Sequence, residues 1–406
     1  MRSFTSKAGK AYVVIILLGI VSLMGDVVYE GSRGLVPGYL AFLGASAFVV
    51  AFVGPLGEFL GYVLRLVSGV LSDTTQAYWF FMFLGYGLII SMPLLGFSHL
   101  WEVAVILVLL ERLGKALRAP SRDAMISIIG RDLGGAGKAF GIHEFLDQIG
   151  AVLGPLLVTS VMFYSGGDYR LTFRFLFFPF IVLLIVLGFA YTRIGKLKPS
   201  ELRETRNINF RNVKFERPFY IYTLAVVLNT VGLIPYGLIL YKADVIVPPE
   251  SSWIPPLIYT IMMVVDAPAA LFSGYAYDRL KIKILILPFA LSVIASLLAM
   301  ADVNLAMLAV AAIFLGLVIG MQESVYRAAV SEFTSPSTRG TAYGIFNTAY
   351  GVGLLASGAV YGLMVTLNTP YHAVVLYVFT VQMVAAALLL NAHFKRPKAE
   401  NNTSAI

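Results

Sequence analysis

Long apolar stretches run through the whole chain and set the narrowest limit on its fold. A membrane-spanning helix needs about 20 mostly apolar residues to cross roughly 30 Å of hydrocarbon. Twelve such stretches follow one another, at 11–40, 45–71, 78–97, 101–119, 139–163, 171–192, 218–241, 253–277, 284–301, 304–327, 340–366 and 371–394. They do not alternate apolar with polar residues, as the strands of a membrane barrel do. We therefore predict an all-α membrane protein with twelve transmembrane helices.

The composition agrees with a chain that lies in lipid. Of its 406 residues, 59% are hydrophobic and 13% are charged, and the mean hydropathy is +0.83. Soluble domains carry about 25% charged residues, so a soluble enzyme is excluded. The chain has no cysteine, which excludes a disulfide scaffold and thiolate chemistry. The first apolar run is not followed by a small-residue cleavage site, so we expect it to be a helix and not a signal peptide.

The net charge of +8 reflects where the Lys and Arg residues lie along the chain. They are concentrated at the two termini and in those connections that share a side with the amino terminus. The positive-inside rule therefore predicts a multi-pass protein of the plasma membrane with both termini in the cytoplasm. Segment 193–217 is the most basic connection. We interpret it as a linker near membrane lipid and not as a nucleic-acid site.

Short motifs recur at a nearly constant offset and predict two similar halves. Gly69-Val-Leu-Ser-Asp73 closes the second stretch and Gly274-Tyr-Ala-Tyr-Asp278 closes the eighth, an offset of 205. Arg122 and Arg327 follow the fourth and tenth stretches, again with an offset of 205. Six spans in each half give both halves the same orientation across the membrane. We predict two pseudo-symmetric six-helix bundles, at 1–192 and 218–406, joined by a cytoplasmic linker at 193–217.

These motifs resemble those of the major facilitator superfamily over essentially the whole chain. The family motif G-x-L-x-D-R-x-G-R-K, between spans two and three, matches Gly69, Leu71 and Asp73, but the basic tail is absent here. The second half retains more of the motif, as Gly274, Asp278, Arg279, Lys281 and Lys283. The resemblance implies a charge latch that closes the cytoplasmic side and a cavity lined mainly by helices 1, 4, 7 and 10.

Two further stretches extend the resemblance towards an antiporter-like prokaryotic branch. Residues 111–123 are similar to D-R-x-G-K-G-x-R-x-x-P-R-D, although Glu111 replaces the Asp and Ala116 replaces a Gly. Gly150-x-x-x-Gly154-Pro155 resembles the fifth-helix signature of the antiporters, although a usual Gly pair is missing at Val158 and Thr159. Physically, small residues at this spacing allow close helix packing, and Pro155 favours a bend.

Charged residues within the predicted spans need a partner or a task, because each costs about 2.5–3.5 kcal/mol at the bilayer centre. Asp26 and Glu30 share one helix face at i, i+4, and repulsion together with burial favours a shared proton. The alternative is that Arg33 or Arg112 neutralises one of them, and for Glu30 we favour a structural or entrance role. His143 and Asp147 are also spaced i, i+4, so the Asp147 carboxylate can orient the His143 imidazole. The candidates for proton coupling are Asp26, Glu30, His143, Asp147 and Asp266.

Other polar residues are candidates for substrate contact or for a gate. Arg112 is expected to clamp an anionic substrate or to set the charge of Asp26, and Glu111 is expected to pair with Lys115. The candidates for the substrate cavity are Tyr29, Arg112, Asn229, Tyr236 and Asn347, with helix packing as the alternative for the aromatic and Asn residues. The candidates for a cytoplasmic gate are Asp73, Arg118, Arg122, Asp278, Arg279, Glu323 and Arg327.

The motifs indicate transport and not catalysis. His143-Glu144-Phe-Leu-Asp147 misses the H-E-x-x-H zinc signature, and the sequence contains no Gly-rich nucleotide loop. We expect no enzyme activity, no cofactor and no bound structural metal. We predict a monomeric secondary active transporter that works by alternating access and exports a small organic molecule in exchange for protons. The alternatives are a divalent metal or metal-chelate carrier, and a non-transporting membrane sensor or scaffold with the same fold.

Overall fold

The computed structural model describes residues 7–130, 136–194, 215–301, 304–334 and 338–394, and all regular elements within these ranges are helices. Residues 195–214, the greater part of the predicted linker, lie outside the described residues. The predicted domain boundaries at 192 and 218 therefore stay predictions.

The first half contains six spans. They are α1 (Lys7–Phe42), α2 (Ala47–Thr75), a third span of α3 (Tyr78–Gly87), η1 (Leu88–Ile90), α4 (Ser91–Leu94) and η2 (Leu95–Phe97), then α5 (Trp101–Gly130), α6 (Ala136–Tyr164), and α7 (Tyr169–Phe175) with α8 (Phe177–Ile194).

The second half also contains six spans. They are α9 (Arg217–Val231) with α10 (Tyr236–Ile246), then η6 (Pro249–Ser251) and α11 (Ile254–Leu280), η7 (Lys281–Leu285) with α12 (Ile286–Met300), α13 (Leu305–Met321) with the π-helical turn η8 (Gln322–Tyr326) and α14 (Arg327–Val330), α15 (Arg339–Thr366), and α16 (Tyr371–Phe394).

Helix length and composition are consistent with twelve spans. Within the described ranges, ten helical stretches are long and apolar enough to cross a membrane. One of them, Pro249–Met300, has 52 residues, which would extend about 78 Å as a single helix, and it comprises both α11 and α12. The amphipathic α5 is not among the ten, because Glu111, Arg112, Lys115 and Arg118 lower its hydropathy. The predicted all-α fold with twelve helices is confirmed.

The two halves repeat one arrangement of helices. In the first half α1 packs on α6 and α8, and both α2 and α3 pack on α5. In the second half α9 packs on α15 and α16, and both α11 and α12 pack on α13. The contacts between halves follow the same symmetry, since α2 packs on α15 and α6 packs on α11. The predicted pair of pseudo-symmetric bundles is therefore confirmed.

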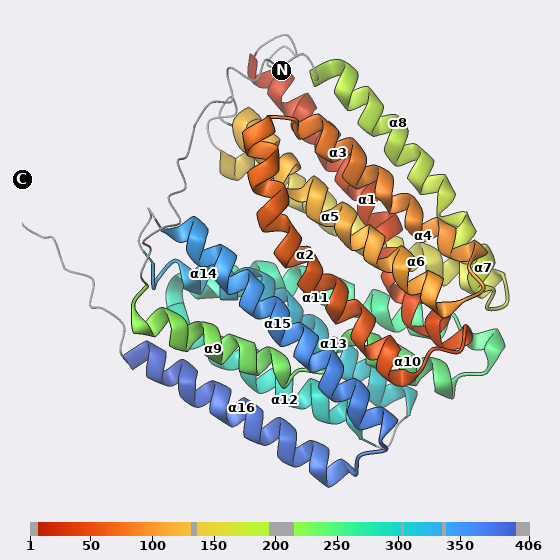
Figure 1. Cartoon of the computed structure of the whole chain (residues 1–406), viewed down its shortest axis with the longest axis vertical. Coiled ribbons are helices and arrows are strands. Elements are labelled where there is room, and N and C mark those ends of the chain that lie inside the picture. Colours follow the sequence, from red (N-terminus) through yellow and green to blue (C-terminus); the bar gives the residue numbers. More distant parts are fainter. Residues whose placement is uncertain (1–6, 131–135, 195–214, 302–303, 335–337, 395–406) are drawn as a thin grey trace, which may run out of the picture.

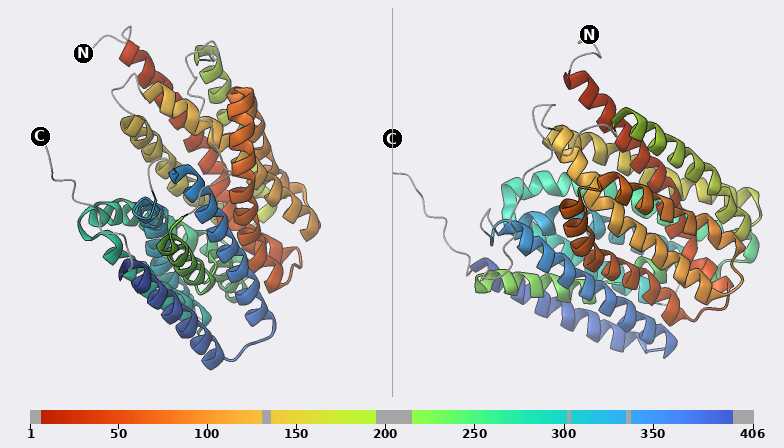
Figure 2. Two further views of the ribbon diagram at one scale, coloured as in Figure 1. Left: turned by 60° about the vertical axis from the view of Figure 1, so that its left-hand side comes forward. Right: turned by 45° about the horizontal axis from the view of Figure 1, so that its top comes forward.

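The bundles approach each other at one end of the molecule and diverge at the other (Figures 1 and 2). Where α1 ends, Tyr169 donates a hydrogen bond of 2.5 Å to Asp244 of the other half, and the rings of Phe163 and Trp253 are 5.4 Å apart. We call this the closed end. The bundles separate towards the opposite end, where α1 begins and α16 ends, and we call this the open end.

Two spans of the second half are interrupted, which the sequence analysis did not predict. The seventh span breaks between Val231 and Tyr236, because Pro235 has no N–H group to continue a helix. Side chains replace the missing helical bonds: Tyr361 donates to the Gly232 carbonyl at 2.7 Å. In the tenth span, α13 passes into the π-helical turn η8, a feature common at functional sites. Both interruptions lie beside the cavity described below.

Small residues of α6 bring this helix against α1. A Cβ atom added at Gly154 would lie 2.6 Å from the Val27 carbonyl oxygen, and one at Gly150 would lie 2.5 Å from the Leu23 oxygen. Only glycine permits so close an approach of the two backbones. The close packing predicted from Gly150-x-x-x-Gly154 is confirmed.

This packing predicts a site-specific loss of stability. Gly154→Ala should lower the melting temperature in detergent by several degrees, because overpacking costs about 1–3 kcal/mol. Gly141→Ala in the same helix is the matched control, since a Cβ there meets nothing within 4 Å; it should leave the melting temperature unchanged or raise it. Equal effects of both substitutions would contradict the packing.

Candidate functional site

A cavity of about 330 Å³ lies between the two bundles. Its walls come from α1, α2, α5 and α6 of the first half and from α10, α11, α13, η8 and α15 of the second. The spans that the resemblance implied, numbers 1, 4, 7 and 10, all contribute. The predicted site residues that line the cavity are Asp26, Glu30, Asp147, Tyr236, Asp266, Glu323, Arg327 and Asn347.

Four charged side chains form a compact network beside this cavity, which we call the central charge cluster: Glu30, Arg33, Glu58 and Arg112. Arg33 Nη1 lies 3.2 Å from Glu30 Oε1, and its Nη2 lies 3.0 Å from Glu58 Oε1. The same Glu58 oxygen accepts from Arg112 Nη1 at 2.8 Å. Two carboxylates and two guanidinium groups thus balance one another, which removes much of the cost of placing charge in a membrane.

The cluster is also joined to the second half by two tyrosines. Tyr259 of α11 donates a 2.5 Å hydrogen bond to Glu30 Oε2, and Arg33 Nε donates to the Tyr236 hydroxyl at 3.1 Å. The two tyrosine rings lie 5.3 Å apart. These contacts lie on the closed-end side of the cavity and link the bundles there.

Tyr29 places three cations around one aromatic ring. The Arg112 Nη1 group donates to its hydroxyl, and the Arg112 and Arg33 guanidinium carbons lie 4.7 and 5.2 Å from the ring centre. Lys115 Nζ lies 4.1 Å from the same centre. Cation–π attraction of this kind stabilises charge where water is scarce. Tyr29, a predicted substrate contact, is buried beside the cluster and is absent from the cavity wall.

Other carboxyl groups of the cavity wall have no such balance. Asp26, Asp147 and Asp266 form no ion pair with any described residue. Asp266 is 5% exposed, and its buried Oδ1 has no hydrogen-bond partner among the described residues. The buried Oδ1 of Asp147 also lacks one. The cavity thus contains two kinds of carboxyl group, those neutralised by arginine and those without a basic partner.

The predicted pairing of Glu111 with Lys115 is wrong, and the structure decides which carboxylates Arg33 and Arg112 neutralise. Glu111 does not pair with Lys115: its Oε1 lies 3.2 Å from Arg118 of the same helix, in a buried ion pair. Arg112 pairs with Glu58 and not with Asp26. Of the two carboxylates on α1, Arg33 neutralises Glu30. The carboxylate that Arg112 neutralises is therefore Glu58 and not Asp26.

His143 and Asn229 are held by buried hydrogen bonds. The His143 Nε2 atom lies 2.8 Å from Ser22 Oγ, which also accepts from Arg122 Nη1 at 3.0 Å. Ser22, and not Asp147, therefore orients the imidazole. Asn229 is fully buried, donates to Gln382 at 2.8 Å and accepts from Tyr326 at 2.6 Å. It packs inside the second bundle, and a role in substrate contact stays a prediction.

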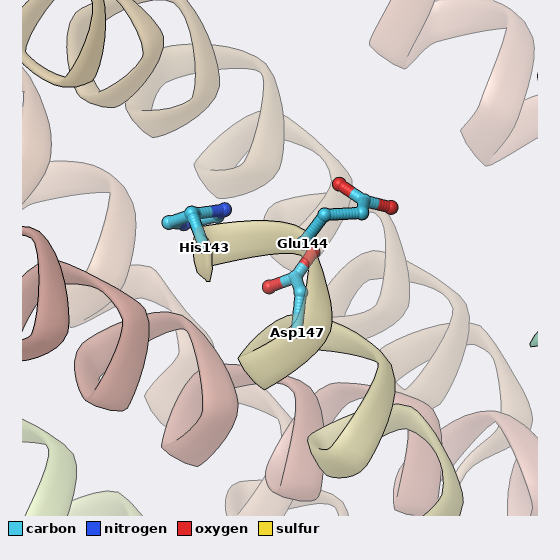
Figure 3. A group of neighbouring side chains, drawn as sticks. All are labelled: His143, Glu144 and Asp147. Carbon is cyan, nitrogen blue, oxygen red and sulfur yellow. The ribbon is translucent and has the colours of Figure 1, made fainter. Parts of the chain in front are cut away.

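One turn of α6 carries a possible metal-binding group. Nitrogen or oxygen atoms of His143, Glu144 and Asp147 lie within 4.8 Å of one another. Figure 3 shows the three side chains on one turn of α6, with Asp147 between His143 and Glu144. The donor set is compatible with a divalent cation.

The predicted gate residues lie towards the open end, and within the described part of the chain no ion pair joins those of one helix to those of another. Arg118 is buried against Glu111, and Arg122 lies 3.0 Å from Asp123. Asp73, Asp278 and Arg279 are exposed where α2 and α11 end. Among the described residues no ion pair joins Asp73 or Asp278 to an arginine of α5 or of the tenth span. This arrangement agrees with a gate that is open, and the gating role stays a prediction.

The sequence analysis missed several residues of the cavity. Glu58 is not among the predicted site residues, although it is the acceptor shared by Arg33 and Arg112. Arg65 and Lys115 also line the cavity, as do Tyr62 and Tyr259. A charge within the apolar run 45–71 was the signal for Glu58. Nothing in the sequence indicates which of several arginines neutralises it.

The hydrogen bond between Tyr259 and Glu30 joins the two bundles, so we expect its loss to destabilise the closed end. Tyr259→Phe removes the bond to Glu30 and should open the closed end more often. Because the chain has no cysteine, a Thr159→Cys reporter can be labelled alone; Thr159 is buried at the closed end beside Thr260. We expect faster maleimide labelling in the Tyr259→Phe background. Tyr377→Phe, which removes a 2.9 Å bond within one bundle, is the control. Equal labelling in both backgrounds would show that the Tyr259 bond does not hold the bundles together.

Comparison with known proteins agrees with this architecture. The model of the Major Facilitator Superfamily matches residues 246–405. An uncharacterized protein of Mycobacterium tuberculosis is 31% identical over 399 residues, which cover 97% of this chain and 96% of the relative. An uncharacterized MFS-type transporter of Methanocaldococcus jannaschii is 28% identical over 387 residues, covering 93% and 94%.

Solved structures show the same fold at low sequence identity. The nucleoside transporter NupG superposes with a TM-score of 0.68 at 14% identity, covering 95% of this chain and 100% of that chain. A mutant of the peptide transporter POT superposes with a TM-score of 0.72 at 13% identity, covering 94% of each chain. The chain belongs to the major facilitator superfamily of membrane transporters.

Proposed function

We propose that this secondary transporter exchanges protons for a small organic molecule and exports that molecule from the cell. The observation that carries the proposal is the contrast between two kinds of carboxyl group in one cavity. Glu30 and Glu58 are neutralised by Arg33 and Arg112. Asp26 and Asp266 line the same cavity without an ion pair among the described residues.

A carboxyl group without a basic partner is best accommodated in a membrane as its neutral form. The charged form costs several kcal/mol at the bilayer centre, whereas binding a proton removes that cost. When the cavity admits water, the same group can release its proton and bind a cationic or polar substrate group instead. Because a carboxylate binds either the proton or the substrate, flows in opposite directions become coupled.

The predicted orientation of the chain is compatible with export. The basic residues favour cytoplasmic termini, and the open end is the end where α1 begins and α16 ends. The conformation then faces the cytoplasm, where an exporter takes up its substrate. Asp147, with its unpartnered Oδ1, lies on α6 nearer the open end than Asp26 does on α1. It would pass protons between Asp26 and the cytoplasm.

A divalent metal carrier is the second candidate, because His143, Glu144 and Asp147 lie close together. Two observations make it weaker. Ser22 already occupies His143 Nε2, and the Arg122 guanidinium bonds to the same Ser22 oxygen, which places positive charge beside the site. Glu30, whose carboxylate could also serve as a ligand, is occupied by Arg33 and Tyr259.

Transport assays in liposomes test the proton hypothesis. Asp26→Asn imitates the neutral carboxyl group, so it should abolish uptake driven by a pH gradient and spare substrate exchange at equal pH. Asp266→Asn should also abolish gradient-driven uptake. The matched control is Glu102→Gln, at an exposed carboxylate at the start of α5. The substrate used is the compound that most raises the melting temperature of the purified protein.

Three results would decide between the candidates. Loss of gradient-driven uptake in the Asp variants alone supports proton exchange. Full pH-driven uptake by Asp26→Asn would remove this residue from the proton path. Binding of Mn²⁺ by the wild-type protein that is lost in His143→Gln and Asp147→Asn, together with loss of both transport modes, would establish metal carriage instead.

A further inference from the structure

Two basic side chains of the cavity wall remain outside the central charge cluster. Arg65 of α2 and Lys115 of α5 line the cavity, and among the described residues neither forms an ion pair. Within the described part of the chain the buried Arg65 Nε has no hydrogen-bond partner either. We call Arg65 and Lys115 the cationic patch. Their helices, α2 and α5, pack against each other.

A small recess opens beside this patch. Arg65, Arg112 and Lys115 line it together with Glu58 and Tyr62, and its volume is about 10 Å³, close to the space that one water molecule needs. The Glu58 carboxylate is already bound by two guanidinium groups. The recess therefore offers room for one oxygen atom, next to cations whose charge the cluster leaves unbalanced.

Carboxyl groups gather on a different part of the wall. Asp147 of α6, Asp266 of α11 and Glu323 of η8 line the cavity, and none forms an ion pair with a described residue. Their elements adjoin, since α11 packs on both α6 and η8. We call these three residues the anionic patch. Arg327, one turn after Glu323, also lines the cavity and offsets part of its charge.

Aromatic side chains lie between these patches. Tyr62 of the first half meets Tyr350 of the second edge to face, with 5.8 Å between the ring centres. Both residues line the cavity, as do Tyr326 and Met262. Such a surface suits the apolar body of a ligand, and charged groups at its margins fix the ligand's orientation.

We propose that the substrate is an amphoteric small molecule, with an anionic group bound by Arg65 and Lys115 and an ammonium group bound by Asp266 and its anionic neighbours. This inference rests on the proposed function and names its substrate class. A molecule with only one charge would leave the other patch without a partner inside the membrane, a state that charged groups avoid. An amphoteric molecule neutralises both patches at once.

Binding to the purified full-length protein at one fixed pH tests the proposal without any proton gradient. The probes are matched quartets: phenylalanine, its methyl ester, N-acetylphenylalanine and N-acetylphenylalanine methyl ester, with the same four forms of leucine and tryptophan. Within a quartet the scaffold is constant, while the anionic group, the ammonium group or both are removed. Melting temperature against ligand concentration gives the affinity of each form. We expect an amphoteric member to bind at least about tenfold more tightly than its three derivatives.

Substitutions then test which protein residue binds the carboxylate of the ligand and which binds its ammonium group. Lys115→Gln should abolish the advantage of the free carboxylate, so that the amino acid and its ester bind equally, and Lys115→Arg should restore that advantage. Asp266→Asn should abolish the advantage of the free amine. Lys138→Gln, at an exposed lysine of α6 outside the cavity wall, should leave both preferences intact. Melting curves without ligand verify that each variant is folded.

The results that would contradict an amphoteric substrate differ from those that would contradict proton exchange. Esters that bind as tightly as the amino acids, preferences that survive Lys115→Gln, or no stabilisation by any quartet at millimolar concentration would each overturn the amphoteric assignment. Such results leave pH-driven transport untouched. Amphoteric binding without pH-driven transport would instead support the substrate class and contradict the proton coupling.

Discussion

The charge arrangement of the whole cavity depends on the ion pairs that Arg33 makes with Glu30 and Glu58. The Arg33 guanidinium binds these two carboxylates from two helices of one bundle and reaches Tyr236 of the other. Unbalanced charge at this depth would cost several kcal/mol for each group. By satisfying two carboxylates, Arg33 makes an ionic centre possible within lipid. It also fixes which acids in the cavity remain without a cation.

This centre couples charge to conformation. Glu30 accepts from Tyr259, and Tyr169 binds Asp244 farther towards the closed end, so the bundles are held together by few polar contacts on that side. Opening the closed end must break them and expose Glu30 to a new environment. Towards the open end, no ion pair between described residues joins predicted gate residues of different helices. A change in the charge of Glu30 would therefore also change the contacts that hold the closed end together, so charge and conformation are linked.

The sequence predicts what depends on one helix at a time. Each apolar run, the repeated Asp73 and Asp278 motifs and the Gly150-x-x-x-Gly154 packing follow from local composition and spacing, and the structure agrees. Pairing between helices does not follow in this way. Arg112 of α5 pairs with Glu58 of α2, because three-dimensional neighbours compete with sequence neighbours. Even within α5, Glu111 pairs with Arg118 and not with Lys115. The break before Tyr236 depends on carbonyl partners such as Tyr361, which lie far along the chain.

Infrared difference spectroscopy between neutral and alkaline pH tests most directly the claim that the cluster leaves Asp26 and Asp266 to hold protons. A protonated carboxyl group has a carbonyl band separate from that of a carboxylate, so each acid can be identified by its loss in a variant. The account predicts a protonated band at neutral pH that shrinks in Asp26→Asn and in Asp266→Asn and is unchanged in Glu58→Gln. A band that survives both Asp substitutions and disappears in Glu58→Gln would contradict it.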